Sequence, residues 1–454
     1  MKTRLIVQKY GGTSVATTEK IKKVAQRVVA TRRQGHQVVV VVSAMGNTTD
    51  RLLASAREVA DDPLRRELDI LLSTGELTSM SLLAMAIRSL GVEAVSLTGG
   101  QSGIVTNDVH NNARILRIHT GRVREELARG TVVVVAGFQG VSTTGEVTTL
   151  GRGGSDTTAT ALAAALGADS CQILTDVDCV YSADPRKVPC AQPLFELHGD
   201  EMQEMAWHGA QVMKAEAVEF AQNNGIGFEI GSAFSETPKS RISVCKEPRE
   251  EAIFVPRRAE VAGVSGRTDL LRLSFAGSAL PSGFWNQLFE LISGYDLVFG
   301  RLNSVGGPVD LLLSTLEIPN PEQLRKDLDE RFGGLVSVDG DLGAVSLIGF
   351  GLGSRPGALF DALRALEETG IEILDAFTGR ESLSFLIAAS QVDEGVLKLH
   401  RTFVETSSPV VSLRSREDGE PSRNPRTEHE HRAQRRDSTS EFKMAACDRL
   451  DTRA

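Results

Sequence analysis

Two short valine-rich runs constrain the fold of this chain more than any other feature. Residues 38–42 read VVVVV and residues 132–136 read VVVVA, so both runs are apolar at every position. A strand with one buried face would alternate apolar and polar side chains, whereas these runs predict strands that are buried on both faces of a sheet. Helices must then cover both sides of that sheet, and we expect an α/β protein.

The first half of the chain alternates short β-branched segments with long helical patterns, the order that builds a mostly parallel sheet. The predicted strands are residues 4–8, 37–43, 93–97, 131–136, 170–175 and 227–231. The predicted helices are residues 18–34, 49–60, 65–90, 120–129, 155–166 and 200–223. We therefore expect an αβα sandwich around a mostly parallel central sheet.

The second half shows two α+β patterns. Residues 344–404 read in the order βαββα, and a closing strand at 410–413 would complete βαββαβ, the order of a ferredoxin-like unit. Residues 270–338 give the same order less clearly, so we expect a pseudo-repeat. The last 40 or so residues are polar and lack apolar periodicity, which predicts disorder. The predicted domains are 1–235 (sandwich), 236–261 (linker), 262–340 and 341–414 (α+β units) and 415–454 (disordered polar tail).

Charge and cysteine content exclude several functional classes. The net charge is −9, with 50 Lys and Arg dispersed among 59 Asp and Glu, so nucleic acid is not an expected partner. The apolar runs are far shorter than the ~20 residues of a membrane-spanning helix, and no secretion signal is evident. The five cysteines show no C-x-x-C spacing, which argues against a disulfide framework and a structural zinc site. We expect a cytoplasmic protein without membrane partners.

Three segments carry candidate chemistry. The first is Lys9-Tyr10-Gly11-Gly12-Thr13-Ser14, which places a cation and two glycine amides where a strand of an open α/β sheet ends. An ordinary glycine turn followed by a helix cap is the alternative interpretation. The second segment, residues 149–158 (TLGRGGSDTT), leads into a helix, so its glycines and the helix N-terminus favour an anion site. Arg152 beside it is suited to a carboxylate.

The third segment, residues 175–186 (TDVDCVYSADPR), follows a buried strand. Tyr181 is suited to contact with a nucleotide base, Asp178 is suited to contact with a ribose, and Arg186 is suited to contact with phosphates. Taken alone, without the other two segments, this segment is better described as an acidic loop with a salt-bridged arginine.

Together these segments resemble the aspartate kinases of the amino-acid kinase superfamily. The matching motifs are QKYGGTSV near the N-terminus, VVVVSAMGNTTD at 39–50, STGE at 73–76, GFQGV at 137–141, TTLGRGGSDTTA at 148–159 and TDVDCVYSADPR at 175–186. The two C-terminal units look like regulatory ACT domains. Six ordered motifs are far more specific than either glycine loop alone.

The resemblance implies transfer of the γ-phosphoryl group of ATP, with Mg²⁺, to the β-carboxylate of L-aspartate. This is the first step towards lysine, threonine and methionine. It also implies a homodimer or higher homo-oligomer and an amino-acid effector at the ACT-like units. The chemistry suits the residues, because a carboxylate is already ionised at pH 7 and needs no general base. Charge repulsion between acceptor and polyphosphate is the obstacle, which positive charge and backbone amides reduce.

By the same resemblance, each motif residue acquires an expected role, and no residue is expected to be a dedicated metal ligand. The expected catalytic residues are Lys9, which bridges the phosphoryl group, and Asp156, which holds Lys9 and organises the magnesium-bound centre. The expected substrate-binding residues are Ser43, Thr49, Glu76 for the ammonium group and Arg152 for a carboxylate. The expected nucleotide-binding residues are Gly11, Gly12, Ser14, Thr175, Asp176, Tyr181, Arg186 and Gln211.

The chain departs from the family pattern in both halves. Gln211 stands where the family usually carries a lysine that reaches the ATP phosphates, and Lys214, three residues on in the same predicted helix, is a candidate replacement. In the second α+β unit the turn at 351–357 is kept. In the first unit Ser282 separates the proline from the glycine of that turn, and Gly300-Arg301 follows where glutamine is usual. We therefore expect a weak response to lysine and threonine.

Two alternatives to an active aspartate kinase stay open on the sequence. One is a kinase for another small carboxylate. The other is a non-catalytic, amino-acid-sensing homologue whose nucleotide site has decayed, as Gln211 would suggest.

Overall fold

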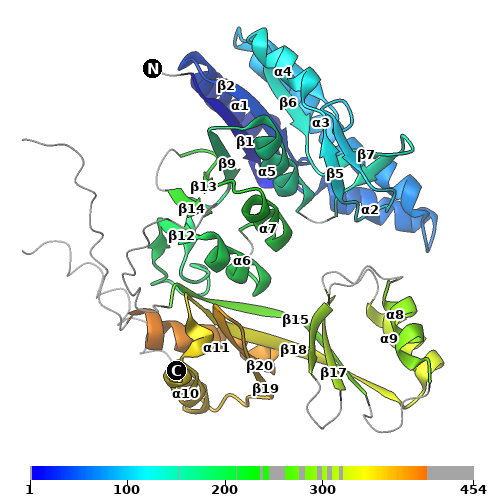
Figure 1. Cartoon of the computed structure of the whole chain (residues 1–454), viewed down its shortest axis with the longest axis vertical. Coiled ribbons are helices and arrows are strands. Elements are labelled where there is room, and N and C mark those ends of the chain that lie inside the picture. The colour runs from blue at the N-terminus through cyan, green and yellow to red at the C-terminus, as the bar shows by residue number, and fades with distance from the viewer. Residues whose placement is uncertain are drawn as a thin grey trace, which may run out of the picture. The chain divides into compact units, whose positions relative to one another are not determined.

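The computed structural model describes residues 3–151, 153–210, 212–235, 239–244, 261–275, 282–293, 299–303, 309–315 and 321–405. The N-terminal half is built on an eight-stranded sheet in the order β12-β14-β13-β9-β1-β2-β6-β3 (Figure 1). Its strands are β1 (Leu5–Tyr10), β2 (Gln37–Val42), β3 (Ala94–Leu97), β6 (Val132–Ala136), β9 (Ser170–Thr175), β12 (Glu196–His198), β13 (Phe228–Ser232) and β14 (Lys239–Ser243). Neighbouring strands are parallel except for β13 and β14. The predicted mostly parallel sheet is confirmed.

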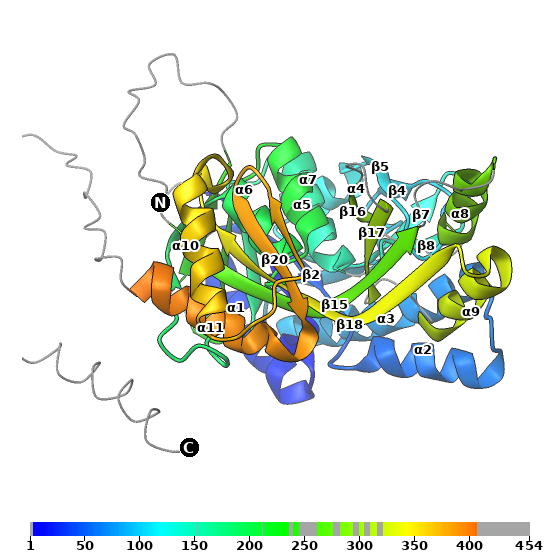
Figure 2. The ribbon, with the colours of Figure 1, turned by 90° about the horizontal axis from the view of Figure 1, so that it is seen from below.

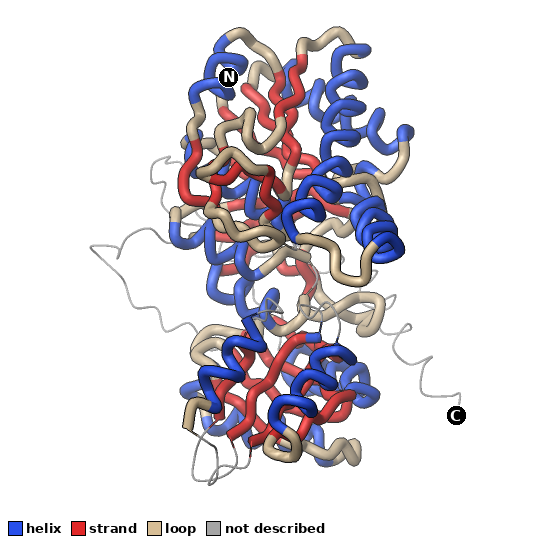
Figure 3. Tube along the Cα trace, turned by 90° about the vertical axis from the view of Figure 1, so that its right-hand side faces the viewer, coloured by secondary structure: helices blue, strands red, loops and turns tan. Residues whose placement is uncertain are grey.

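Helices cover both faces of this sheet, as the valine runs predict. On one face Val38, Val40 and Val42 of β2 pack with α1 (Thr18–Arg33) and α3 (Arg65–Ser89). On the other face Val39 and Val41 pack with α4 (Gly121–Ala128) and α5 (Gly154–Leu166). The alternate valines thus enter two separate cores, which is why no polar position interrupts the run. Figure 3 shows the strands enclosed by helices.

Helix α3 has a length and a hydropathy that would fit a membrane span. It is the one such helix among the described residues, and half of its most apolar window is buried. Leu83 and Ile87 lie in the core between α3 and the sheet. We therefore assign α3 as a core helix of the sandwich.

A four-stranded sheet that the sequence does not predict lies in the same half. Its order is β5-β4-β7-β8, and its strands are β4 (Ile104–Thr106), β5 (Ile115–Ile118), β7 (Gln139–Ser142) and β8 (Val147–Thr149). A two-stranded ribbon pairs β10 (Val180–Tyr181) with β11 (Pro193–Leu194), and helix α2 spans Thr48–Val59.

The single helix predicted at 200–223 is wrong. The structure instead has α6 (Gly199–Trp207) and α7 (Ala215–Asn223), separated by residues 208–214. Gly209 has φ = +105°, a conformation outside the helical region. Lys214 is consequently the N-cap residue of α7 rather than a residue inside a longer helix.

The C-terminal half forms one six-stranded sheet in the order β16-β17-β15-β18-β20-β19 (Figure 2). Two 13-residue strands, β15 (Gly263–Phe275) and β18 (Val336–Ile348), run antiparallel through its centre. The other elements are α8 (Phe284–Ser293), β16 (Phe299–Asn303), β17 (Val309–Ser314), α9 (Pro321–Phe332), α10 (Pro356–Glu367), β19 (Asp375–Thr378), β20 (Ser382–Ala388) and α11 (Val392–His400).

The two α+β units share these long strands. The first unit uses the second half of β15, then α8, β16, β17 and α9, and closes with the first half of β18. The second unit begins with the second half of β18 and continues through α10, β19, β20 and α11. In the second unit, residues 263–267 of β15 pair with β18. They occupy the position that the closing strand of a ferredoxin-like unit would take. The predicted closing strand at 410–413 and the tail at 415–454 lie outside the described residues.

Candidate active site

Lys9 and Asp156 form an ion pair at the carboxyl end of the central strand β1. The Nζ atom of Lys9 lies 2.6 Å from Oδ1 of Asp156, and both side chains are about nine-tenths buried, with exposures of 11% and 9%. Lys9 comes from β1, and Asp156 comes from the first turn of α5. Removing two charges from water is costly unless each one satisfies the other. The structure therefore brings together the two predicted catalytic residues.

The turn after Lys9 is shaped by its glycines. A Cβ atom on Gly12 would lie 2.8 Å from the carbonyl oxygen of Ala44, so a larger residue would separate this turn from the loop after β2. The amide of Gly11 donates to the carbonyl of Leu174 at 3.2 Å, which ties the turn to the end of β9. The hydroxyl of Ser14 is buried without a hydrogen-bond partner in the described part of the chain.

Glu76 is a buried carboxylate on α3. Its Oε1 atom accepts a hydrogen bond from the amide of Ala44 at 2.9 Å, while Oε2 is buried and has no partner among the described residues. Burial raises the pKa of Glu76 to about 7, because desolvation penalises the charged form. Such a site favours a ligand that brings a positive charge to Glu76.

Glycine also permits the approach of α3 to this region. A Cβ atom on Gly75 would lie 2.8 Å from the Cβ of Ala44 and 3.6 Å from Cγ2 of Thr48. Thr49 lies in the first turn of α2, and Ser43 directly follows β2. The backbone carbonyl of Ser43 accepts a hydrogen bond from Ser79 of α3. The predicted substrate residues Ser43, Thr49 and Glu76 are thus positioned by one junction of α3 with the loop after β2.

The sequence gives no sign of a second buried carboxylate, Asp69, which lies two turns before Glu76 on α3. Asp69 is fully buried and accepts a 2.5 Å hydrogen bond from the Thr149 hydroxyl. It also bonds Nδ1 of His110 at 2.7 Å and the amide of Asn111 at 3.0 Å. Asp69 thereby joins α3 to the β4–β5 hairpin and to the start of the glycine-rich loop. Asp69, Ser73 and Glu76 share one buried face of α3, so this polar face is the feature that Asp69 has in common with the predicted substrate residue.

The glycine-rich loop passes from Thr149 into α5. Gly151 and Gly153 both have positive φ angles, +74° and +73°, and Gly153 is the N-cap residue of α5. A side chain on Gly137, at the end of β6, would collide with Ser155 in the first turn of α5, at 2.7 Å from its hydroxyl oxygen. Arg152 lies outside the described residues, so its predicted contact with a carboxylate stays a prediction.

The predicted nucleotide segment follows β9. The Thr175 hydroxyl donates to Asp176 at 2.9 Å, and the Tyr181 hydroxyl donates to Asp178 at 3.0 Å. Desolvation, together with this bond to Asp178, raises the pKa of Tyr181. Arg186 is exposed and pairs with Asp184, and their hydrogen bonds raise the pKa of Arg186 and lower that of Asp184.

The pair of Arg186 with Asp184 agrees with the interpretation of this segment as an acidic loop with a salt-bridged arginine. Contact of Arg186 with phosphates stays a prediction. Gln211, the remaining predicted nucleotide residue, lies outside the described residues.

Comparisons with family models, with known protein sequences and with solved structures all match the same kind of enzyme. The model of the amino acid kinase family matches residues 4–232. The aspartokinase of Mycolicibacterium smegmatis is 42% identical over 410 residues, which cover 88% of this chain and 96% of that protein. The aspartokinase of Geobacillus stearothermophilus is 40% identical over 404 residues, which cover 88% and 97%. Among solved structures, E. coli aspartokinase III in complex with aspartate and ADP is similar with a TM-score of 0.74 and 25% identity, covering 88% of this chain and 99% of that chain.

Proposed function

The chain belongs to the amino acid kinase family and, within it, to the aspartokinases, and we propose that it phosphorylates the β-carboxylate of L-aspartate with ATP to give 4-phospho-L-aspartate. The observation that carries the proposal is the buried Lys9–Asp156 pair at the edge of the sheet where the glycine-rich loop enters α5. An aspartokinase similar to this chain has been solved with aspartate and ADP, the acceptor and one product of this reaction.

The acceptor carboxylate attacks the γ-phosphorus of magnesium-bound ATP, and ADP leaves. Because the β-carboxylate of aspartate is ionised at pH 7, no general base is required. The ammonium of Lys9 offsets the negative charge on the transferring group, and Asp156 fixes that ammonium in position. The carboxylate of Asp156 would also be the group to hold the magnesium that accompanies ATP, and that ion would reduce the charge of the phosphates.

The acceptor site follows from Glu76 and its neighbours. The Oε2 atom of Glu76, which has no partner among the described residues, is assigned to the α-ammonium group of aspartate, which would supply a positive partner. Arg152 is assigned to an acceptor carboxylate, and Thr49 and Ser43 to hydrogen bonds with the acceptor. Thr175, Asp176, Tyr181, Arg186 and Gln211 are assigned to the nucleotide on the resemblance alone.

One experiment separates this function from both alternatives. ADP release is measured with aspartate, with glutamate and without an acceptor, while the acyl phosphate is trapped as a hydroxamate. We expect hydroxamate with aspartate only. Hydroxamate with another carboxylate would replace aspartate as the acceptor, and ATP binding without hydroxamate from any acceptor would support the non-catalytic alternative.

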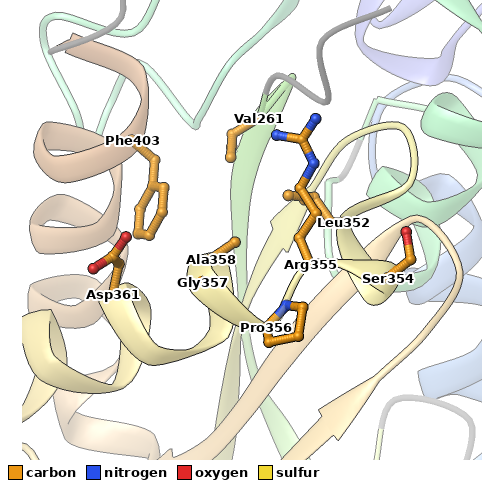
Figure 4. Close-up of a pocket in the computed structure, with 9 residues that line it drawn as sticks. All are labelled: Val261, Leu352, Ser354, Arg355, Pro356, Gly357, Ala358, Asp361 and Phe403. Carbon is orange, nitrogen blue, oxygen red and sulfur yellow. The ribbon is translucent and has the colours of Figure 1, made fainter. Parts of the chain in front are cut away.

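We further propose that the two α+β units are ACT domains that form a homodimer and bind an amino-acid effector. In the second unit a cavity of about 520 Å³ lies at the turn that precedes α10 (Figure 4). Its lining combines the charged side chains of Arg355 and Asp361 with the apolar side chains of Val261, Leu352 and Phe403. Opposite charges beside an apolar wall suit a zwitterionic amino acid.

The product belongs to the synthesis of aspartate-derived amino acids. We propose that this product is an early intermediate in the synthesis of lysine, threonine and methionine. We also propose that the enzyme acts in the cytoplasm.

A further inference from the structure

The side chain of Lys214 lies directly over the glycine-rich loop of the candidate active site. A Cβ atom on Gly153 would collide with Cγ of Lys214 and would lie 2.6 Å from its Cβ and 3.2 Å from its Cδ. Gly153 is therefore the residue that makes room for the aliphatic stem of Lys214. The ammonium, two bonds beyond Cδ, is held in the neighbourhood of this loop by the packing of the stem.

The break between α6 and α7 is what brings Lys214 to this place. In one continuous helix Lys214 would be an interior position, whereas here it is the N-cap of α7 with extended backbone angles, φ = −77° and ψ = 141°. Gly153 is in turn the N-cap of α5. Two helix N-termini thus meet at the contact between Lys214 and Gly153, and both favour negative charge nearby.

Among the described residues at this loop, Lys9 and Asp156 are charged side chains of the candidate site, and their charges oppose each other. Lys9 is held by Asp156 at 2.6 Å, so the carboxylate offsets part of the positive charge that the ammonium of Lys9 presents to a polyphosphate. The hydroxyl of Ser14, in the turn after Lys9, is fully buried and has no partner in the described part of the chain, so it is a donor that an anion would satisfy. Additional positive charge would favour a polyphosphate at this loop, and the packing of Lys214 on Gly153 places that side chain beside it.

We propose that Lys214 binds the phosphates of ATP, the role that the resemblance gives to the lysine expected at position 211. This inference rests on the proposed kinase function and assigns a further nucleotide-binding residue to the same site. The stem of Lys214, packed on Gly153, limits the rotamers of the side chain, so little conformational entropy is lost when the phosphates bind. Gly153 and Lys214 form one functional unit, since a side chain at 153 would displace the lysine.

The test measures nucleotide binding separately from turnover. Lys214→Met keeps a long apolar side chain on Gly153 and removes the charge, and Lys22→Met removes an equivalent charge from the exposed face of α1 as a matched control. ATP binding to the full chain is titrated by calorimetry in the presence of Mg²⁺ and without aspartate. We expect Lys214→Met to weaken ATP binding by roughly 10-fold or more, as for the loss of one charge-assisted hydrogen bond, and Lys22→Met to leave it unchanged.

Steady-state kinetics then distinguish phosphate binding from a structural role. We expect the KM for ATP to rise in Lys214→Met with the KM for aspartate within about twofold of the parent value, and Lys214→Arg to recover most of the affinity. ATP binding within twofold of the parent in Lys214→Met, or equal losses for ATP and aspartate, would overturn the proposal. Absence of acyl phosphate from the parent enzyme would refute the kinase function instead, and the calorimetric comparison would still apply.

A second variant tests the exchange of positions 211 and 214. Gln211→Lys in the Lys214→Met background should restore tight ATP binding, whereas Gln211→Lys in the parent should change it by less than about threefold, because Lys214 already supplies the cation. An equal gain in both backgrounds would show that the two positions act independently and would contradict the replacement of one lysine by the other.

Discussion

The carboxylate of Glu76 accepts a hydrogen bond from the amide of Ala44 with one oxygen, at 2.9 Å, while its other oxygen is buried without a partner among the described residues. Ala44 follows β2, and Gly75 allows α3 to approach it closely enough for this bond. The carboxylate is therefore held in one orientation but is not neutralised, and burial raises its pKa to about 7. A ligand ammonium would complete this arrangement.

The first prediction concerns the pH dependence of aspartate binding. Glu76 must be ionised to bind the α-ammonium group, so below its pKa of about 7 a proton competes with the substrate. The KM for aspartate should rise as the pH falls from 7 to 5.5, approaching tenfold per pH unit, while the substrate carboxylates stay ionised. Glu76→Gln should have a high KM that no longer changes with pH in this range. A parent KM that is constant between pH 5.5 and 8 would contradict the assignment of Glu76 to the ammonium group.

The second prediction concerns the change of stability with pH. This change should have the opposite sign from the one that a salt-bridged carboxylate causes. The pKa of Glu76 is raised in the folded state, so the folded protein binds the proton more tightly than the unfolded chain. The free energy of unfolding should therefore fall as the pH rises from about 4.5 to about 7, by roughly 3 kcal/mol from this group.

Glu76→Gln keeps the hydrogen bond to Ala44 without the charge, so its stability relative to the parent should increase between pH 5 and pH 8. Urea unfolding of both proteins at the two pH values is the measurement. A stability difference that does not change with pH would show that Glu76 titrates normally.

The third prediction concerns the ion pair. Lys9→Ala should reduce kcat by several orders of magnitude with a smaller effect on KM, because charge on the transferring phosphoryl group is greatest in the transition state. Asp156→Asn should give a comparable loss, since the lysine would no longer be held at 2.6 Å. Lys22→Ala, on the exposed face of α1, is the control. Activity within tenfold of the parent in Lys9→Ala would exclude Lys9 from phosphoryl transfer.

The fourth prediction concerns the positioning role of Asp69. Its carboxylate faces hydrogen-bond donors from Thr149, His110 and Asn111, and the amide group of an asparagine would place a donor against one of them. Asp69→Asn should lower the free energy of unfolding by roughly 2–4 kcal/mol and raise the KM for aspartate, because Thr149 begins the loop that carries Arg152.

Asp108→Asn is the matched control, since Asp108 is exposed in the β4–β5 hairpin, which Asp69 contacts, and accepts hydrogen bonds from Thr143 and Thr144. The KM for aspartate is measured for Asp69→Asn and for the parent under conditions in which both proteins have the same folded fraction. An unchanged KM in a destabilised Asp69→Asn protein would limit Asp69 to a purely structural role.

The elements that the sequence predicts well are those whose own residues determine them. The strand at 170–175 and the helix at 321–332 appear with the predicted bounds, because apolar periodicity and a proline at the helix start are local signals. The four-stranded sheet is missed because strands of three or four residues, such as β4 and β8, are too short to show a period.

The residues of the candidate site are less predictable from local sequence than these elements are. Lys9 and Asp156 are distant in sequence, and the family resemblance, rather than any local pattern, predicts that they meet. Asp69 is missed because an acidic residue in an α-helix is normally exposed, and its burial depends on a hydrogen bond from Thr149 of the four-stranded sheet. The position of Lys214 on Gly153 depends on the break before α7, which the continuous helical pattern at 200–223 conceals.

The last prediction concerns control of the enzyme. The cavity in the second α+β unit offers Arg355 and Asp361 beside apolar side chains, and Ala358 at the start of α10 lies on its wall. In the first unit the turn sequence has changed around Ser282, so we expect a homodimer whose activity responds weakly, or not at all, to millimolar lysine and threonine.

An amino acid that does bind at the cavity should raise the melting temperature of the parent and alter its activity, because it favours one arrangement of the enzyme over another. Ala358→Phe, which fills the cavity, should abolish both effects, whereas Ala358→Ser should retain them. Strong inhibition by lysine or threonine that survives Ala358→Phe would locate the effector elsewhere and restore ordinary feedback control through the first unit.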